Sequence, residues 1–269
     1  RRHMNAKALL YGVFLLLPLA LQAAVPQTVA APDMTAEHTA FVLKLADGRV
    51  LKGQQLQGAV VHMGIEGGKL ASIKLASIKP DPQDPDILRH EFQVQNDKGE
   101  WQPACQPNFY GETWGFPISL PEHHPGREGA ITLTCASGAV GKCIRFGYKP
   151  WALGPKGEDL TPYHAACVHM VRADYAGDGE PHTKNGTNID VYDRIGIQSS
   201  ESKADPSFGF EAGWSPTGAV CVARTRWADV ITTGALWKAV PRLAVPCSED
   251  AAAKLGALLF NRSKLGTEQ

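Results

Sequence analysis

The residues best suited to chemistry lie in one short stretch of the chain, from Tyr163 to Thr183. A histidine beside a thiol can act as a general base for a nucleophilic cysteine, and this pairing supports acyl transfer through a thioester. No other stretch concentrates reactive side chains so strongly, so it is the candidate functional site. Its potentially reactive residues are His164, Cys167, His169, Arg172, Asp174, Asp178 and His182.

Local sequence features indicate how these side chains are positioned. Thr161-Pro162 is typical of a helix start, with a hydroxyl N-cap followed by proline at the first helical position. The run from Tyr163 to Tyr175 contains neither Gly nor Pro and is predicted to stay helical. Gly177 and Gly179 then end the helix and permit a sharp turn, which we expect to bring His182 back toward the helix end.

The stretch also carries a family resemblance. Ala173-Asp174-Tyr175 followed by Gly177-Asp178-Gly179 resembles the signature of the bacterial ADYC-domain family, whose pattern has cysteine where this chain has Ala176. Similar exported proteins include cysteine-dependent L,D-transpeptidases that crosslink peptidoglycan, and the resemblance implies that activity and partner. Further matching pieces, over roughly residues 40 to 240, are Lys142-Cys143, Gly147-Tyr148-Lys149-Pro150-Trp151, His164-Ala165-Ala166-Cys167 and Gly186-Thr187 leading into Ile189-Asp190-Val191-Tyr192-Asp193.

The resemblance makes position 176 the expected nucleophile site, and the chain geometry ranks the histidines that could serve it. His182 comes first because the glycine turn can fold it back, His169 second and His164 third. Arg172, Asp174, Tyr175 and Gly177 are the expected substrate-binding residues, for peptidoglycan stem peptides. The alternative is that the motif residues only pack within the fold. In that case Asp174 caps the turn or pairs with Arg172. No cofactor or metal is expected, since the chain has no CxxC pair, HExxH helix or phosphate-binding glycine loop.

The charge balance and the first thirty residues of the chain limit the classes of function that it can have. Lys plus Arg and Asp plus Glu number 27 each, giving a net charge of zero, which argues against nucleic-acid binding. Residues 1–30 have the pattern of a secretory signal peptide: a positive start, an apolar run from Ala8 to Leu21, and small residues after it. A membrane anchor is the alternative for this segment, but the run is short and contains Pro18. No later stretch is long and apolar enough to span a bilayer, so a periplasmic protein is expected.

The chain contains six cysteines, and an even number in an oxidising compartment predicts disulfides, with fifteen pairings open. Cys135 and Cys143 flank a glycine-containing turn and could pair locally. Cys167 is expected to bridge inward from the helix, and Cys221, in a β-branched run, is expected to be buried and bridged.

The predicted fold class is α+β, mainly antiparallel β with a central helix and a C-terminal helix. After the signal peptide we expect one domain over residues 31–269: a β part at about 37–150, a motif-bearing part at about 151–247, and a helix at 248–260 that Ser248 caps. Strands are expected at Phe41–Leu45, Val50-Leu51, Ala59–Met63, Glu91–Gln95, Ala130–Cys135, Cys143–Phe146, Ile189–Tyr192 and Ala219–Thr225. The direct repeat of Leu-Ala-Ser-Ile-Lys at residues 70–79 indicates a local duplication or a bulged strand, because five-residue spacing conflicts with the two-residue period of a strand.

Two functions follow as hypotheses. The first is a periplasmic cysteine-dependent peptidoglycan L,D-transpeptidase-like protein, inactive as given because Ala176 lacks the sulfur. The second is a disulfide-stapled exported binding or structural domain without catalysis, in which the motif is a packing device.

Overall fold

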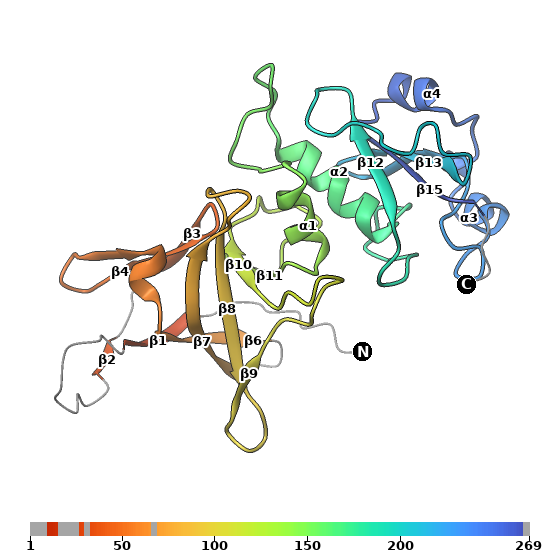
Figure 1. Ribbon diagram of the computed structural model, residues 1–269. Helices are drawn as coiled ribbons and strands as arrows, with labels where there is room; N and C mark the ends of the chain where they lie inside the picture. Colours follow the sequence, from red (N-terminus) through yellow and green to blue (C-terminus); the bar gives the residue numbers. More distant parts are fainter. Residues whose placement is uncertain (1–9, 16–26, 30–32, 66–68, 266–269) are drawn as a thin grey trace. The chain divides into compact units, whose positions relative to one another are not determined.

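The computed structural model describes residues 10–15, 27–29, 33–65 and 69–265. The chain divides into two compact units, Arg1–Gly141 and Lys142–Gln269, and each is described by itself (Figure 1). Most of the predicted signal peptide lies outside the described residues. Its described parts, Leu10–Leu15 and Gln27–Val29, are the strands β1 and β2.

Unit 1 is built from antiparallel strands. An eight-stranded sheet has the order β11-β10-β8-β7-β6-β1-β2, with β9 paired to β8, and a separate three-stranded sheet has the order β3-β4-β5. Besides β1 and β2, the elements are β3 (Asp33–Glu37), β4 (Ala40–Lys44), β5 (Val50–Lys52), η1 (Gly53–Leu56), β6 (Val60–Ile65), β7 (Lys69–Pro80), β8 (Leu88–Gln95), β9 (Trp101–Pro103), β10 (Gly115–Ile118) and β11 (Thr132–Cys135). The strands predicted at Phe41–Leu45, Val50-Leu51, Glu91–Gln95 and Ala130–Cys135 are therefore confirmed as β4, β5, β8 and β11, with bounds that differ by a few residues.

The repeat Leu-Ala-Ser-Ile-Lys forms the single strand β7, and the predicted bulge is present. Leu75 pairs with Phe92 and Ser77 with Glu91, so the register shifts by one residue at Ala76. The bulge brings Leu75 and Ile78 to the same buried face although they are three residues apart. As a result Ile73 and Ile78, the equivalent isoleucines of the two copies, both reach the core.

Helix α1, Ala139–Arg145, lies where a strand was predicted for Cys143–Phe146. That prediction is wrong. The apolar side chains Val140, Cys143 and Ile144 recur at a spacing of three and four residues, which is the period of one helix face and not of a strand.

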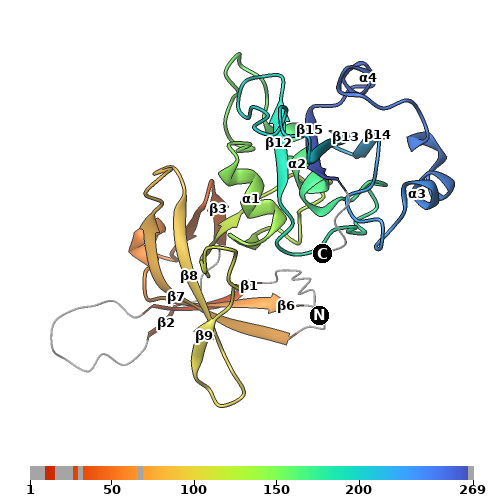
Figure 2. The same ribbon diagram turned by 45° about the vertical axis from the view of Figure 1, so that its right-hand side comes forward.

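Unit 2 is a four-stranded antiparallel sheet with the order β12-β15-β13-β14 (Figure 2). Helix α2 packs on β13, β14 and β15, and α4 packs on β13. The elements are α2 (Thr161–Arg172), β12 (Ile189–Asp193), β13 (Phe208–Ser215), β14 (Gly218–Val222), α3 (Thr233–Ala239), η2 (Pro241–Leu243), α4 (Glu249–Lys254) and β15 (Leu259–Lys264). The mainly antiparallel α+β class is as predicted, whereas the number and placement of helices differ.

The C-terminal helix is shorter than expected. Ser248 caps it through a 3.2 Å bond from the Ala251 amide, as predicted, but α4 ends at Lys254 and not at residue 260. Residues Leu259–Lys264 instead form β15, which lies between β12 and β13. Within the predicted helix range, Leu255 lies in the turn after α4 and Leu259 in the buried strand β15.

All six cysteines form disulfides: Cys105–Cys135, Cys143–Cys167 and Cys221–Cys247. The local Cys135–Cys143 pair is therefore wrong, while the bridged states of Cys167 and Cys221 are confirmed. Three disulfides fit a protein exported from the reducing cytoplasm. In the described part of the chain, no helix combines the length and the apolar character that a membrane span needs.

The repeat offers a matched stability test, because its two leucines have the same neighbours in sequence but differ in burial. Leu75 is fully buried, whereas Leu70 is 55% exposed. We expect Leu75→Ala to lower the free energy of unfolding by about 2–5 kcal/mol and Leu70→Ala to change it by less than about 0.5 kcal/mol. Chemical denaturation of both variants measures this, and equal effects would contradict the placement of the two leucines on opposite faces of β7.

Candidate functional site

Helix α2 ends earlier than its sequence predicts. Ala173 takes a left-handed conformation with φ of 49°, and the amides of Ala173 and Asp174 bond back to the carbonyls of Met170 and His169 at 3.1 and 2.9 Å. These two bonds form a Schellman ending, which usually has glycine at the left-handed position. Arg172 is consequently the last helical residue, and Tyr175 lies in the following loop.

The start of α2 also differs from the prediction. The helix begins at Thr161 after Leu160, and no side chain caps it. The Thr161 hydroxyl donates instead to the Pro150 carbonyl at 3.1 Å. The predicted cap residue therefore ties the helix start to the preceding segment.

The Asp174 carboxylate organises the loop after α2. Its Oδ1 accepts from the amides of Gly177 and Asp178 at 2.9 and 3.2 Å, and its Oδ2 accepts from the Gly179 amide at 3.0 Å. Oδ2 also bonds to His169 Nδ1 at 2.8 Å. Burial opposes ionisation of this side chain, but the bonds from His169 and the loop amides outweigh it and lower its pKa. The turn-capping alternative for Asp174 is thus what the structure contains.

His169 is held at both ring nitrogens. Nδ1 lies 2.8 Å from Asp174 Oδ2, and Nε2 lies 3.1 Å from the Pro216 carbonyl, in the turn between β13 and β14. His169 is therefore buried with both ring nitrogens in contact with protein oxygens, and it ties α2 and its loop to the β13–β14 turn.

His182 returns to the end of α2, as the glycine turn predicted. Its amide donates to the Arg172 carbonyl at 3.1 Å, and its Nδ1 lies 3.2 Å from the Ala173 carbonyl. Of the other two expected histidines, His164 is completely buried in α2 and His169 is buried at its end. The role of His182 as a base stays a prediction.

Arg172 closes the loop from the other side, where its Nη2 donates to the Gly179 carbonyl at 2.5 Å. It does not form the predicted pair with Asp174, whose carboxylate is occupied by His169 and the amides.

Tyr175 anchors the loop in the core of unit 2. Its ring stacks on Trp214 at 5.3 Å between centroids and tilts against His182 at 5.9 Å. Its hydroxyl donates to Glu211 Oε1 at 3.1 Å and accepts from the Arg226 amide at 2.8 Å. Burial, together with the charge of Glu211, raises the pKa of Tyr175 well above its usual value. This tyrosine is a neutral core residue.

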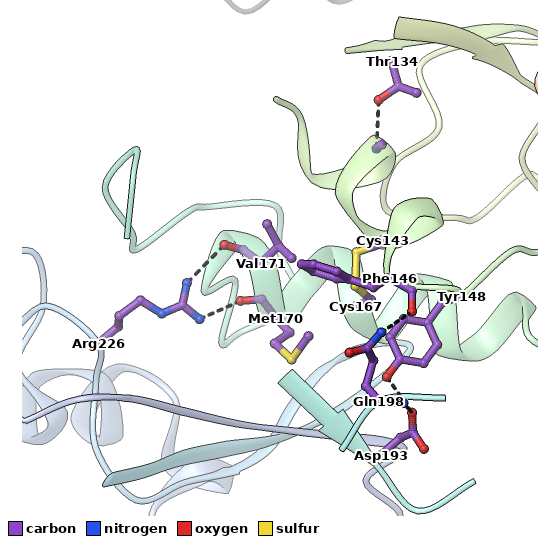
Figure 3. Close-up of a disulfide and its surroundings, with 11 residues drawn as sticks. Thr134, Cys143, Phe146, Tyr148, Cys167, Met170, Val171, Asp193, Gln198 and Arg226 are labelled. Atoms are coloured by element: carbon purple, nitrogen blue, oxygen red, sulfur yellow. Dashed lines mark hydrogen bonds between the residues drawn. A yellow bond between two sulfur atoms is a disulfide. The ribbon is translucent and has the colours of Figure 1, made fainter. Parts of the chain in front are cut away.

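A buried ion pair, missed by the sequence analysis, joins Tyr175 to α2. Arg226 forms a bidentate pair with Glu211 through Nε and Nη2, at 3.1 and 3.0 Å. The same guanidinium donates to the Met170 and Val171 carbonyls at 2.7 and 3.1 Å, as Figure 3 shows. It thereby satisfies the open carbonyls at the end of α2. Glu211 is fully buried; desolvation would raise its pKa, yet the charge and hydrogen bonds of Arg226 hold it below its usual value.

A disulfide holds the middle of α2 to α1. Cys167 of α2 bonds to Cys143 of α1, and both are fully buried. Figure 3 shows the neighbouring bonds from the Tyr148 hydroxyl to Asp193 Oδ2 at 2.8 Å and from Gln198 Nε2 to the Phe146 carbonyl at 2.7 Å. Helix α2 is therefore held covalently near its middle and by Arg226 at its end.

Position 176 lies in this loop, and its side chain is half-buried. The Ala176 carbonyl accepts from Arg242 Nη2 at 2.8 Å, while Arg242 Nη1 donates to the Ala219 carbonyl at 2.6 Å. Gly177, next in the chain, has φ of 77°, and a Cβ there would lie 1.9 Å from the Thr217 carbonyl oxygen. Only glycine allows the loop to approach the β13–β14 turn so closely.

A cavity of about 660 Å³ lies on unit 2 beside the segment that follows His182. Its walls are the turn at residues 184–188, the segment at residues 224–229, and the end of β15 at Ser263-Lys264. The Trp227 indole donates to the Thr187 hydroxyl at 2.9 Å, and that hydroxyl donates to the Lys184 carbonyl at 2.7 Å, so two of the walls are linked. No local sequence pattern marks this cavity, because its residues come from three separate segments.

Among the residues that the structure describes, no group of three or more His, Cys, Asp or Glu side chains is arranged to hold a metal ion.

One known protein family matches this chain. The family model of the ADYC domain matches residues 53–228, which is more than half of the chain. The match includes the Asp174 loop, Tyr175, Glu211 and Arg226. Comparison with curated proteins and with solved structures gives no significant match.

The glycines of the loop give a prediction with an internal control. Gly179 has φ of 90° and open space around its Cβ position, so Gly179→Ala should cost about 1–2 kcal/mol from backbone strain alone. Gly177→Ala adds a clash with the Thr217 carbonyl and should cost roughly 3 kcal/mol or more. Denaturant unfolding compares the two, and similar losses would argue against the close approach at Gly177.

The lowered pKa of Asp174 predicts a pH dependence. A carboxylate with a folded-state pKa below its unfolded value of about 3.9 stabilises the fold fully above that pH. This stabilisation is lost as the pH falls through the lower, folded-state pKa. We therefore expect the difference in unfolding free energy between the wild type and Asp174→Asn to be constant from pH 5 to 7 and to shrink below about pH 4. A difference that is independent of pH would contradict an ionised Asp174.

Proposed function

The chain belongs to the ADYC domain family, and from this premise we propose that it is a non-catalytic, disulfide-stapled exported domain that binds a ligand. The observation that carries the proposal is the use of the family motif as a packing device. Asp174, His169 and Tyr175 are buried, and each has its polar atoms bonded within the unit. A substrate could reach these atoms only by displacing those bonds.

The cysteines support the same proposal. Cysteine catalysis needs a thiolate, and every cysteine of this chain is in a disulfide. Such bridges are typical of exported domains that keep their shape in an oxidising compartment. With the signal-peptide pattern of residues 1–30, they favour a periplasmic location. Peptidoglycan is then the most abundant polymer within reach, and we propose its stem peptides as the partner.

A second candidate function is a cysteine-dependent L,D-transpeptidase-like fold whose nucleophile is absent. Position 176 is half-buried and not sealed, and His182 lies at the end of α2 with its Nδ1 3.2 Å from the Ala173 carbonyl. Arg242 lies at the Ala176 carbonyl and brings positive charge to the same place. These three observations favour this candidate over catalysis elsewhere in unit 2.

In such a reaction a thiolate at position 176 would attack a carbonyl of the donor stem. The amine of the terminal residue would leave with a proton from the histidine, and a thioester would remain. An amine of a second stem would then attack the thioester carbonyl, give its proton to the histidine and release the thiolate. Ala176 has no sulfur, so the chain as it stands cannot form the thioester.

Isolated peptidoglycan sacculi test the proposed function. We expect the wild-type chain to co-sediment with sacculi in a saturable way and to leave their muropeptide profile unchanged on chromatography. Loss of a muropeptide or appearance of a crosslinked one with the wild type would refute the non-catalytic proposal. Absence of any co-sedimentation would refute peptidoglycan as the partner.

Ala176→Cys separates the two candidates. A matched control is Ala244→Cys, because residue 244 is exposed and lies in unit 2. If the domain only binds, the thiol at 176 should react with iodoacetamide with the pH profile of an ordinary thiol, near 8.5, like the control. A profile shifted to lower pH, together with a muropeptide–protein thioester detected by mass spectrometry, would favour the transpeptidase candidate instead.

A further inference from the structure

The cavity on unit 2 has a charge that its own residues do not balance. Its walls carry Lys184, Arg224, Arg226 and Lys264 but a single carboxylate, Asp229. Lys184 pairs with Asp229, and Arg226 pairs with Glu211. No carboxylate of the described residues forms an ion pair with Arg224 or Lys264, so the cavity keeps an excess of two positive charges.

Arg224 is placed to meet a ligand. Its Nη2 donates to the Ser263 hydroxyl at 2.8 Å and to the Lys264 carbonyl at 2.5 Å, so the guanidinium is fixed to the end of β15. Its Nη1 makes only a 3.5 Å contact with the Thr225 carbonyl, which leaves donors available. All these partners are neutral oxygens, so they hold the guanidinium in place without cancelling its charge.

The rest of the lining is polar and firmly held. Lys184 lies over the Trp227 ring at 4.1 Å, and the indole bonds to Thr187. Asn185, Asn188 and Thr225 add amide and hydroxyl groups to the walls. The volume of about 660 Å³ is in the range of small-ligand sites. Cations beside neutral hydrogen-bonding groups select an anion on a polar body.

From this geometry we infer that the cavity binds the carboxylate of a small peptidoglycan fragment, with Arg224 and Lys264 contacting the charge and the amide and hydroxyl walls contacting its polar body. The inference rests on the proposed function, because it identifies where that binding takes place and which group is recognised. The carboxylate can come from the end of a stem peptide or from the lactyl group of a muramic sugar.

Calorimetric titration of the full chain tests this with four probes. These are diacetyl-L-Lys-D-Ala-D-Ala, its C-terminal amide, N-acetylmuramic acid and N-acetylglucosamine. We expect one acid to bind roughly tenfold or more tightly than its uncharged counterpart, and the pair showing the difference identifies the source of the carboxylate. Equal affinities within both pairs, binding of neither acid, or tighter binding of inorganic phosphate than of either acid would overturn the inference.

Variants locate the site. Lys264→Gln and Arg224→Lys should each weaken binding of the acid roughly tenfold. The matched control is Lys254→Gln, which makes the same charge change on α4, outside the cavity. Circular dichroism establishes that each variant is folded; if Arg224→Lys is not, Lys264→Gln alone decides. If Lys264→Gln binds like Lys254→Gln, the site is elsewhere. Sacculus binding that survives in Lys264→Gln would then refute the cavity while leaving the proposed function standing.

Discussion

A buried ionised carboxylate needs hydrogen-bond partners, and Asp174 meets this constraint with His169 and three loop amides. The amides can converge only if the chain turns sharply after α2, which Ala173 achieves with its left-handed backbone. His169 extends the arrangement to the β13–β14 turn. Helix, loop and sheet in unit 2 are therefore oriented by one charged group.

A second buried charge pair strengthens this arrangement. Glu211 and Arg226 neutralise each other, and together they bond the Tyr175 hydroxyl and two carbonyls at the end of α2. Removing one partner of such a pair leaves an uncompensated charge in the core. The two networks meet at the dipeptide Asp174-Tyr175, which explains why these neighbouring residues form the centre of the motif. Asp174 and Tyr175 thus each join the loop after α2 to the packed interior of unit 2.

The sequence was informative where the determining interactions are local. Local sequence patterns predicted strands β4, β5, β8 and β11 of unit 1, and the glycines after Tyr175 predicted the return of His182. Long-range contacts account for the failures. The end of α2 depends on Asp174 reaching His169. The predicted helix 248–260 wrongly includes the first two residues of β15, because the partners of this strand, β12 and β13, are distant in sequence. Arg226 is bonded to Glu211, fifteen positions away, and has no local pattern that reveals it. The roles expected for Ala176, His182 and Arg172 stay predictions.

The bulge at Ala76 bears on how such a chain can change length. Tandem duplication of an odd number of residues would normally move every later side chain of a strand to the opposite face of the sheet. The bulge leaves Ala76 unpaired, and the later side chains therefore return to their original face. As a result Ile73 and Ile78 both point into the core. A β-sheet can in this way accommodate an insertion of an odd number of residues through one unpaired bulge residue, without any compensating substitution in the strands on either side.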